Sequence, residues 1–288
     1  MRSIREALVA MQPAFGPLEP ERRALLEAHG RFLATDALAT EDAPAFDQSA
    51  MDGYAVHAED VATAGEDTPV ILPMVDESRA GGHLPLPLAR GTTCRVFTGA
   101  RMPEHANAVV VQEDTSRDVV GVHIKFAPRL DQHIRRRGSD VTSGERIVAA
   151  GTEIGAAEIA LLASQGYTTV SVTRRPRVAI ISTGDELIEL GEPRVEGGII
   201  NGNAWALAAS VLAAGGEPLV MPIARDVLAD VSARIAAALH ADVVITTGGV
   251  SVGDHDVTRD AMADAGVTLD FWKVAMKPGK PMAFGLAG

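Results

Sequence analysis

Residues 243–256, VVITTGGVSVGDHD, decide the fold class of this 288-residue chain. The apolar run at residues 243–245 is typical of a buried strand, and the glycines and acidic residues after it are typical of a loop. Glycine lets backbone amides approach a ligand closely, and a carboxylate can hold a cation. This segment therefore predicts a strand that ends in a ligand-binding loop.

Two other segments have a related layout. Residues 178–186, VAIISTGDE, run from an apolar strand through a Thr-Gly turn to the acidic pair Asp185 and Glu186. Residues 271–281, FWKVAMKPGKP, place three lysines around a Pro-Gly turn, namely Lys273, Lys277 and Lys280. Two acidic glycine loops and one lysine loop predict a site for a phosphorylated ligand and a metal ion.

Beyond residue 176, apolar strands alternate with helices. Strands are expected over residues 178–182, 219–223, 243–246 and 269–274, and helices over residues 203–214, 227–239 and 257–265. Strands separated by helices of roughly 10–15 residues imply a parallel sheet covered on both faces. Ligands bind outside the carboxyl ends of such strands, so all three loops are expected on one edge. The predicted fold class is multidomain α/β, with a doubly wound, mostly parallel sheet in this part.

The first 174 residues have a different pattern. Helical spacing with a capping-box start predicts a helix over residues 3–14, and a second helix is expected over residues 19–28. Residues 46–126 are short apolar runs broken by Gly and Pro, which predicts a mostly β segment. Another helix is expected over residues 156–164, ended by Gly166.

These changes of pattern divide the chain into three expected domains. Residues 1–40 and 129–174 form a small α+β linking domain, residues 41–128 a mostly β domain, and residues 175–288 the α/β domain. A hydrophobic content of 47% supports substantial cores, and the 4% aromatic content indicates aliphatic packing.

Composition argues against several classes of protein. A formal net charge of -12 argues against a general nucleic-acid binder, since phosphate contacts need clustered Lys and Arg. The local exception is the run at residues 135–137, RRR, which is either a solvated turn paired with nearby acids or an anion-binding site. The single cysteine, Cys94, excludes an intramolecular disulfide and a cysteine-based zinc site, and its strand-like context favours a core residue over a nucleophile.

Targeting and membrane signals are not found in the sequence. The N-terminus lacks the pattern of a signal peptide, and no run approaches the roughly 18–20 apolar residues of a membrane span. A soluble cytoplasmic protein is expected.

The charged side chains of the loops suggest their roles. Asp185, Glu186 and Asp256 carry hard oxygen ligands that suit Mg²⁺. The lysines of the third loop can neutralise an oxyanion. His255 is either an acid–base group or a hydrogen-bonding partner of its neighbouring aspartates. A P-loop kinase is excluded, because the Gly279-Lys280 pair lacks the first glycine and the Ser or Thr of that motif.

Six blocks of the sequence together resemble the molybdopterin molybdenumtransferase family, the MoeA and gephyrin E-domain type. In chain order they are DQSAMDGYA (47–55), FTGARMPEHANAVVVQED (97–114), RRRGSD (135–140), RPRVAIISTGDEL (175–187), TTGGVSVGDHD (246–256) and FWKVAMKPGKP (271–281). The resemblance implies an enzyme that inserts molybdate into adenylylated molybdopterin with Mg²⁺ and releases AMP. It also implies a homodimer whose active site lies between the glycine-loop domain of one subunit and the β domain of the other. The resemblance also implies contacts with other proteins of molybdenum cofactor assembly.

The resemblance also assigns residues. Expected catalytic positions are Asp47, Thr98, Asp140, Asp226, Asp256, Lys273 and Lys277. Expected cofactor-binding positions are Ser49, Thr183, Gly184, Asp185, Gly248, Gly249, Ser251, Gly253 and Lys280, and the expected metal ligands are Glu186 and Asp256. From its local sequence alone, Asp226 is predicted to be a helix N-cap.

Family members continue beyond the position of Gly288 into a loop, a closing helix and a C-terminal β-barrel, so a truncated chain without the barrel is expected. Two alternative functions remain open. One is a molybdopterin adenylyltransferase, whose family shares the glycine-loop domain but lacks the β segment. The other is an inactive pterin-binding or scaffold module.

Overall fold

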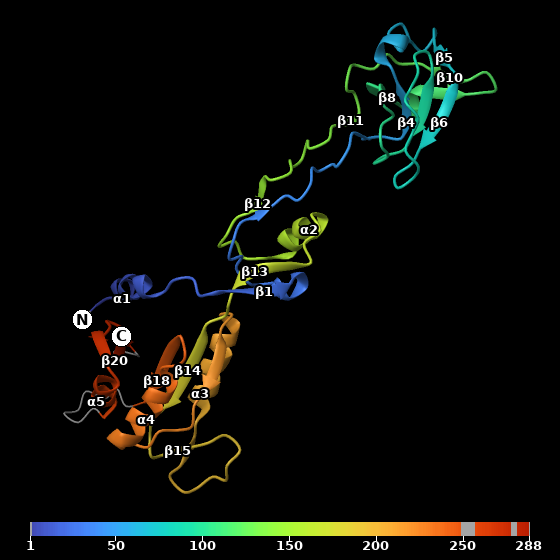
Figure 1. Cartoon of the computed structure of the whole chain (residues 1–288). Coiled ribbons are helices and arrows are strands. Elements are labelled where there is room, and N and C mark those ends of the chain that lie inside the picture. Colours follow the sequence, from blue (N-terminus) through green and yellow to red (C-terminus); the bar gives the residue numbers. More distant parts are fainter. Residues whose placement is uncertain (1, 249–256, 278–280, 288) are drawn as a thin grey trace. The chain divides into compact units, whose positions relative to one another are not determined.

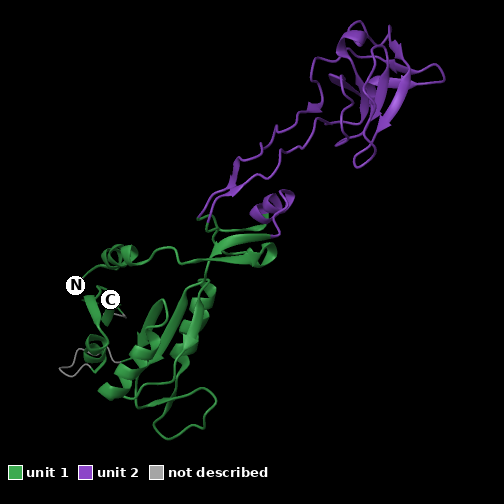
Figure 2. Cartoon of the chain, in the orientation of Figure 1, with its two compact units in different colours: residues 1–34, 151–156, 169–288 green, residues 35–150, 157–168 purple. Residues whose placement is uncertain are grey.

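The computed structural model describes residues 2–248, 257–277 and 281–287, and the chain divides into two compact units (Figures 1 and 2). Unit 1 contains Met1–Ala34, Gly151–Ala156 and Thr169–Gly288. Unit 2 contains Thr35–Ala150 and Ala157–Thr168. Each unit has its own sheets and its own apolar core.

A three-stranded parallel sheet forms the centre of unit 1. Its central strand is β14 (Arg177–Ser182), which lies between β17 (Glu217–Val220) and β18 (Val243–Thr247) (Figure 1). The register pairs Val178 with Val243 and Ser182 with Thr247, so β14 and β18 end side by side. The expected strands at β14 and β18 are confirmed, whereas β17 begins and ends earlier than the expected residues 219–223 and overlaps them only at Leu219 and Val220.

Helices cover both faces of this sheet. Because successive residues of a strand point to opposite faces, Val178 and Ile180 pack with α3 (Gly202–Ala213). Ala179 and Ile181 pack on the other face with α4 (Leu228–Ala238) and α5 (Val257–Asp264). Ile180 and Ile181 are completely buried, and burial of each such side chain contributes roughly 1.5–3 kcal/mol relative to exposure. The strand β15 (Leu187–Ile188) pairs in parallel with β16 (Ile199–Ile200) just before α3.

The last two strands depart from the expected parallel sheet. In the described residues, β19 (Val267–Lys273) pairs antiparallel with β20 (Pro281–Ala287) and with no strand of the parallel sheet. The expectation that residues 269–274 join that sheet is therefore corrected, and β20 is a strand that the sequence did not predict. Antiparallel strands can be joined by a short connection, whereas parallel strands need a long crossover. Because the apolar run that begins at Pro281 follows β19 after a short connection, β19 can pair with it antiparallel.

The N-terminal helix packs on this ribbon. α1 (Ile4–Met11) contributes Ala7 to a cluster with Phe271 and Val274. Its predicted capping box is confirmed, since the Glu6 amide donates to Ser3 Oγ over 3.3 Å and the Ser3 amide donates to the Glu6 carboxylate over 2.6 Å. A 3₁₀ turn, Gln12–Ala14, follows.

The predicted helix over residues 19–28 is wrong. The chain forms β1 (Pro20–Ala24) followed by a 3₁₀ turn at Leu25–Ala28, and β1 pairs antiparallel with β13 (Thr169–Thr173). The intrinsic helix propensity of residues 19–28 is only a weak preference. The pairing of β1 at five positions with β13, about 150 residues away in the sequence, overrides it.

Unit 2 contains two larger sheets. A four-stranded sheet has the order β6 (Met74–Ser78), β7 (Thr93–Val96), β4 (Gly53–Val56) and β8 (Ala108–Val111). A three-stranded sheet has the order β5 (Val70–Leu72), β10 (Val122–Ile124) and β9 (Thr115–Arg117). Residues of both sheets, such as Val56 and Ile124, share one buried cluster. The mostly β prediction for residues 46–126 is confirmed, with 3₁₀ turns at Ala58–Val61 and Gln112–Asp114.

Two short antiparallel ladders complete unit 2. β3 (Gln48–Ser49) pairs with β11 (Ile134–Arg135), and β2 (Ala37–Leu38) pairs with β12 (Arg146–Val148). The helix α2 (Ala156–Ser164) has the predicted bounds, and Gly166 ends it at a φ of 77°.

Cys94 is a core residue, as predicted. It lies in β7 with no exposed surface, and burial raises the pKa of its thiol to about 12. Such a thiol stays protonated at neutral pH, which excludes a nucleophilic role in the folded protein. None of the described helices combines the length and the apolarity needed to cross a bilayer.

Candidate functional site

Two of the three predicted loops meet at the carboxyl edge of the parallel sheet. Thr183 directly follows β14, and its amide donates to the carbonyl oxygen of Thr247 over 3.0 Å. Gly248 directly follows β18 and has a φ of 95°. A Cβ atom on Gly248 would lie 2.8 Å from Thr183 Oγ1 and closer still to the Thr183 carbonyl oxygen. Only glycine therefore allows these two loops to approach as they do.

The hydroxyl of Thr183 has no partner at this junction. The residue is 4% exposed, and within the described part of the chain no group forms a hydrogen bond with Oγ1. Buried polar atoms are nearly always hydrogen-bonded, so an unpartnered one at the carboxyl end of a parallel strand indicates a place for a ligand atom.

The acidic residues of the first loop lie next to this junction. The Gly184 amide donates to the Ala224 carbonyl oxygen over 3.1 Å, and a Cβ on Gly184 would lie 2.6 Å from a carboxylate oxygen of Glu186. The Asp226 amide donates to Asp185 Oδ1 over 3.3 Å. The structure therefore brings Asp226 next to the acidic pair Asp185 and Glu186, from which it is about 40 residues away in sequence.

Arg225 also belongs to this neighbourhood, although no sequence pattern predicted it. Its guanidinium Nη1 donates to the carbonyl oxygens of Asp185 over 3.0 Å and Leu187 over 3.4 Å. The guanidinium therefore ties the acidic loop to the segment that enters α4. The only signal in the sequence is a basic residue directly before Asp226.

The predicted N-cap role of Asp226 is wrong. The N-cap residue of α4 is Val227, which offers no side-chain cap. Instead Asp230, in the first turn, accepts a hydrogen bond from the Arg225 amide over 2.8 Å. The Asp226 carboxylate is thus not used for capping and is exposed beside the loop.

The acidic loop opens onto a cavity of about 320 Å³. Four carboxylates and one guanidinium line it, those of Asp185, Glu186, Glu192, Glu196 and Arg225. Such hard oxygen donors fit Mg²⁺, which proteins hold with one or two carboxylates together with substrate phosphate. The described residues contain no group of three His, Cys, Asp or Glu side chains that would hold a metal alone.

Several predicted positions lie outside the described residues. These are Gly249, Ser251, Gly253, His255, Asp256 and Lys280. Lys273 is the last residue of β19 and Lys277 lies four residues later, and both are exposed. Because β19 pairs with β20, strand order alone does not bring these lysines to the edge that carries Thr183 and Gly248.

The remaining predicted residues gather in unit 2, around β3. The carboxylate of Asp47 forms an ion pair with the Arg136 guanidinium and accepts a hydrogen bond from the Arg137 amide over 2.8 Å. Partial burial raises the pKa of Asp47, but these two donors outweigh it, so that the pKa lies below its usual value. Ser49 is buried, and its Oγ donates to the Met51 carbonyl oxygen over 2.6 Å.

Thr98 and Asp140 lie in the same neighbourhood of unit 2. Both the amide and the hydroxyl of Thr98 donate to Asp52 over 2.8 Å. These donors, the amide most strongly, lower the pKa of the Asp52 carboxyl. Asp140 forms an ion pair with Arg135, which lies in β11 opposite Gln48 of β3.

Each arginine of the run at residues 135–137 forms an ion pair with an aspartate. Arg135 pairs with Asp140, Arg136 with Asp47 and Asp131, and Arg137 with Asp42. The structure therefore agrees with the prediction that nearby acids pair with this run, and not with the prediction of an anion-binding site.

The chain matches two known family descriptions. Residues 2–166 match the MoeA N-terminal region (domain I and II), and residues 179–287 match a probable molybdopterin binding domain. A molybdopterin molybdenumtransferase from Nostoc sp. is 42% identical over 259 residues, which are 90% of this chain and 59% of that protein. Molybdopterin molybdenumtransferase 2 from Mycobacterium tuberculosis is 38% identical over 291 residues, covering 99% of this chain and 72% of that protein.

A solved structure also resembles the fold. The chain superposes on a molybdopterin biosynthesis moeA protein from Pyrococcus horikoshii with a TM-score of 0.87 and 32% identity. The match covers 100% of this chain and 72% of that one.

Proposed function

The chain belongs to the molybdopterin molybdenumtransferase family, and from this premise we propose that it inserts molybdate into adenylylated molybdopterin and releases AMP. The observation that carries the proposal is the junction of Thr183 and Gly248 beside Asp185, Glu186 and Asp226. It combines an unpartnered buried hydroxyl with acidic groups at the carboxyl ends of parallel strands, where α/β sheets bind ligands.

The residues of this junction have different tasks in the proposed reaction. The hydroxyl of Thr183 donates to a phosphate or pterin oxygen, and Gly248 leaves room for that ligand to approach the backbone. Glu186, with Asp256, would hold Mg²⁺, which supplies positive charge to the phosphoanhydride when bound. Lys273, Lys277 and Lys280 neutralise molybdate, and Asp226 orients the groups that react.

The two clusters of predicted residues support a site built from two subunits. Thr183 and Asp226 lie in unit 1, whereas Asp47, Ser49, Thr98 and Asp140 lie in unit 2. We propose a homodimer in which the β segment of one subunit faces the glycine loops of the other. A cytoplasmic location and contacts with other proteins of molybdenum cofactor assembly are part of the same proposal.

A domain division goes with this proposal. Residues 1–40 and 129–174, residues 41–128, and residues 175–288 are the proposed domains. Helices on both faces of the β17-β14-β18 sheet support a doubly wound arrangement in the last of them.

The test is the rate of AMP release from adenylylated molybdopterin on addition of molybdate and Mg²⁺. In Asp226→Asn the backbone amide that holds Asp185 is kept, so the loop remains in place while the carboxylate charge is lost. We expect the rate to fall at least about tenfold, the loss of some 1.4 kcal/mol of transition-state stabilisation. Asp264→Asn, an exposed residue at the end of α5, is the matched control and should leave the rate unchanged.

Other results would point elsewhere. An unchanged rate in Asp226→Asn would contradict the proposed role of this residue. Pterin binding without AMP release would favour the scaffold alternative. The adenylyltransferase alternative is not favoured, because residues 2–166 match the MoeA N-terminal region and contain the folded β segment.

A further inference from the structure

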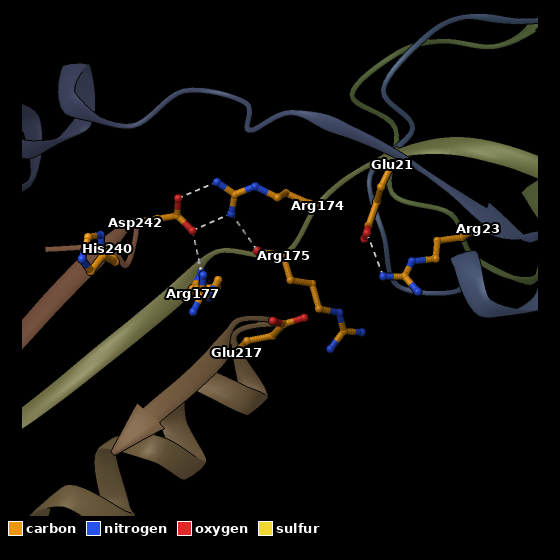
Figure 3. Close-up of a pocket in the computed structure, with 8 residues that line it drawn as sticks. All are labelled: Glu21, Arg23, Arg174, Arg175, Arg177, Glu217, His240 and Asp242. Carbon is orange, nitrogen blue, oxygen red and sulfur yellow. Dashed lines mark hydrogen bonds and ion pairs between the residues drawn. The ribbon is translucent and has the colours of Figure 1, made fainter. Parts of the chain in front are cut away.

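A second cavity, of about 370 Å³, lies at the opposite edge of the parallel sheet and is rich in arginine (Figure 3). Arg177 begins β14, Glu217 begins β17, and Asp242 directly precedes β18. Along β14 the distance from Arg177 to Thr183 is about 20 Å, at about 3.3 Å per residue. This arginine cavity is therefore separate from the acidic cavity at the carboxyl edge.

Two of the arginines are held by acids. The Arg174 guanidinium donates to both carboxylate oxygens of Asp242, each over 2.6 Å, and to Glu19 over 2.7 Å. The Arg23 guanidinium donates to Glu21 over 2.7 Å. These pairs fix the walls of the cavity.

Two other guanidinium groups are not paired in this way. Within residues 2–248, 257–277 and 281–287, the guanidinium groups of Arg175 and Arg177 form no hydrogen bond or ion pair with a protein group. Figure 3 shows the Arg175 side chain extending between Glu217 and the Glu21–Arg23 pair. In addition, Nε of Arg23 is buried without a hydrogen-bond partner in the described part of the chain. A buried donor without an acceptor costs free energy, and the Arg23 guanidinium adds positive charge beside the cavity.

The charges in the cavity define the ligand. A guanidinium group presents its N–H donors in a planar fork that matches phosphate oxygens, and several forks in one cavity favour a phosphate group. Glu217 is the one lining carboxylate that forms no direct ion pair with a described residue, and its charge opposes an anion. Two unpaired guanidinium groups against one carboxylate leave the cavity net positive, in a chain with a formal net charge of -12.

We propose that this arginine cavity binds a phosphate group, either free phosphate or the phosphate of a nucleoside monophosphate, through Arg175 and Arg177. The site is independent of the proposed reaction at the other edge of the sheet. Neither unpaired guanidinium forms a hydrogen bond with Asp242, which accepts from the backbone amide of Arg177 and not from its side chain. The charge of Arg177 contributes only a minor attraction that helps to lower the pKa of Asp242. Both side chains can therefore be changed without breaking that pair.

The experiment is calorimetric titration with inorganic phosphate and, separately, with AMP, at an ionic strength held constant with chloride. We expect the double variant Arg175→Gln/Arg177→Gln to bind phosphate at least about tenfold more weakly, since two charge-assisted forks are lost. We expect Glu217→Gln to bind it several-fold more tightly, because a repelling charge is removed. AMP binding that is tighter than phosphate binding and that the double variant weakens identifies a nucleotide as the ligand, because AMP bound at the carboxyl edge would not respond to this variant. Binding of AMP that is no tighter than that of phosphate, or that the double variant leaves unchanged, identifies free phosphate as the ligand of the arginine cavity.

Two controls make the test specific. Arg79→Gln removes the same charge from a guanidinium that pairs with Glu77 in unit 2, and it should leave the affinity unchanged. Arg225→Gln changes the acidic cavity at the carboxyl edge. Loss of phosphate binding in Arg225→Gln but not in the double variant would overturn the proposal, as would unchanged affinity in the double variant or no binding of either ligand.

Discussion

Arg174 and Asp242 form a bidentate ion pair, with two hydrogen bonds, that joins the segment between β13 and β14 to the turn before β18. Both hydrogen bonds are 2.6 Å long, and the same carboxylate accepts the Arg177 amide over 2.7 Å (Figure 3). Arg174 also pairs with Glu19, so one guanidinium links the segment before β1 to the parallel sheet.

We expect Asp242→Asn to lower the free energy of unfolding, and the effect to depend on pH. The hydrogen bonds from Arg174 lower the pKa of Asp242 to about 2, although partial burial opposes them. A carboxyl whose pKa is lower in the folded than in the unfolded state stabilises the folded protein at pH values above its unfolded pKa, which is near 4. This stabilisation is lost as the pH falls toward the folded pKa of about 2. Because water screens the pair, we expect a cost of about 1 kcal/mol at neutral pH.

The measurement is urea unfolding of both proteins between about pH 6 and pH 3, where the difference should shrink as the carboxylate becomes protonated. Asp264→Asn serves as the control, since this carboxylate lies exposed at the end of α5. A difference that grows as pH falls would contradict the assigned role of the pair.

We expect Gly248→Ala to destabilise unit 1 more than a comparable change elsewhere. The new Cβ would lie 2.8 Å from Thr183 Oγ1 and closer to the Thr183 carbonyl oxygen, at a φ of 95°. Backbone strain and this overlap together should cost roughly 2–4 kcal/mol in urea unfolding. Gly215→Ala is the matched control, because its φ is 84° but no atom lies within 4 Å of the added Cβ. Equal costs for the two variants would exclude the close approach.

We expect Thr183→Val to preserve stability while it reduces activity. Valine keeps the shape of the side chain and removes a buried hydroxyl that has no partner among the described residues, so the free energy of unfolding should stay the same or rise. The rate of AMP release should fall about tenfold, as for one lost hydrogen bond to a charged group. Thr183→Ser retains the hydroxyl and should retain most of the activity. Loss of stability with normal activity would show that the hydroxyl is structural.

We expect Arg225→Gln to impair the reaction through the position of the acidic loop. The guanidinium holds the carbonyl oxygens of Asp185 and Leu187, so its loss should release the loop that carries Glu186. Steady-state kinetics should show a raised KM for the pterin substrate and a higher Mg²⁺ concentration for half-maximal rate, with partial rescue in Arg225→Lys. An Arg225→Gln variant that lowers stability but leaves both values normal would assign a purely structural role.

We expect the Cys94 thiol to be inert in the folded protein. Burial raises its pKa to about 12 and leaves it no exposed surface. A thiol reagent should therefore label Cys94 only as fast as the protein opens, and complete labelling should require denaturant. Rapid labelling under native conditions would show that the β7 region opens readily.

Much of the candidate site was predictable from short patterns in the sequence. Apolar runs that end in Thr-Gly predicted β14 and β18 and the loops after them, because the end of a buried strand and the start of a glycine turn are both local properties. The parallel pairing of these strands then brings Thr183 next to Gly248. The role of Arg225 was not predictable, because it depends on two carbonyl oxygens about 40 residues away.

Helices with clear caps or terminators, such as α1 and α2, were predictable from local sequence patterns, as was the alternation of strands and helices from β14 to α5. In contrast, three features depend on long-range contacts in the folded chain: residues 20–24 form a strand, β19 pairs with β20, and Asp242 pairs with Arg174. The physical reason is the range of the interactions. Side-chain periodicity and capping act over a few residues, whereas strand pairing and ion pairs depend on partners that the chain brings together only when it folds.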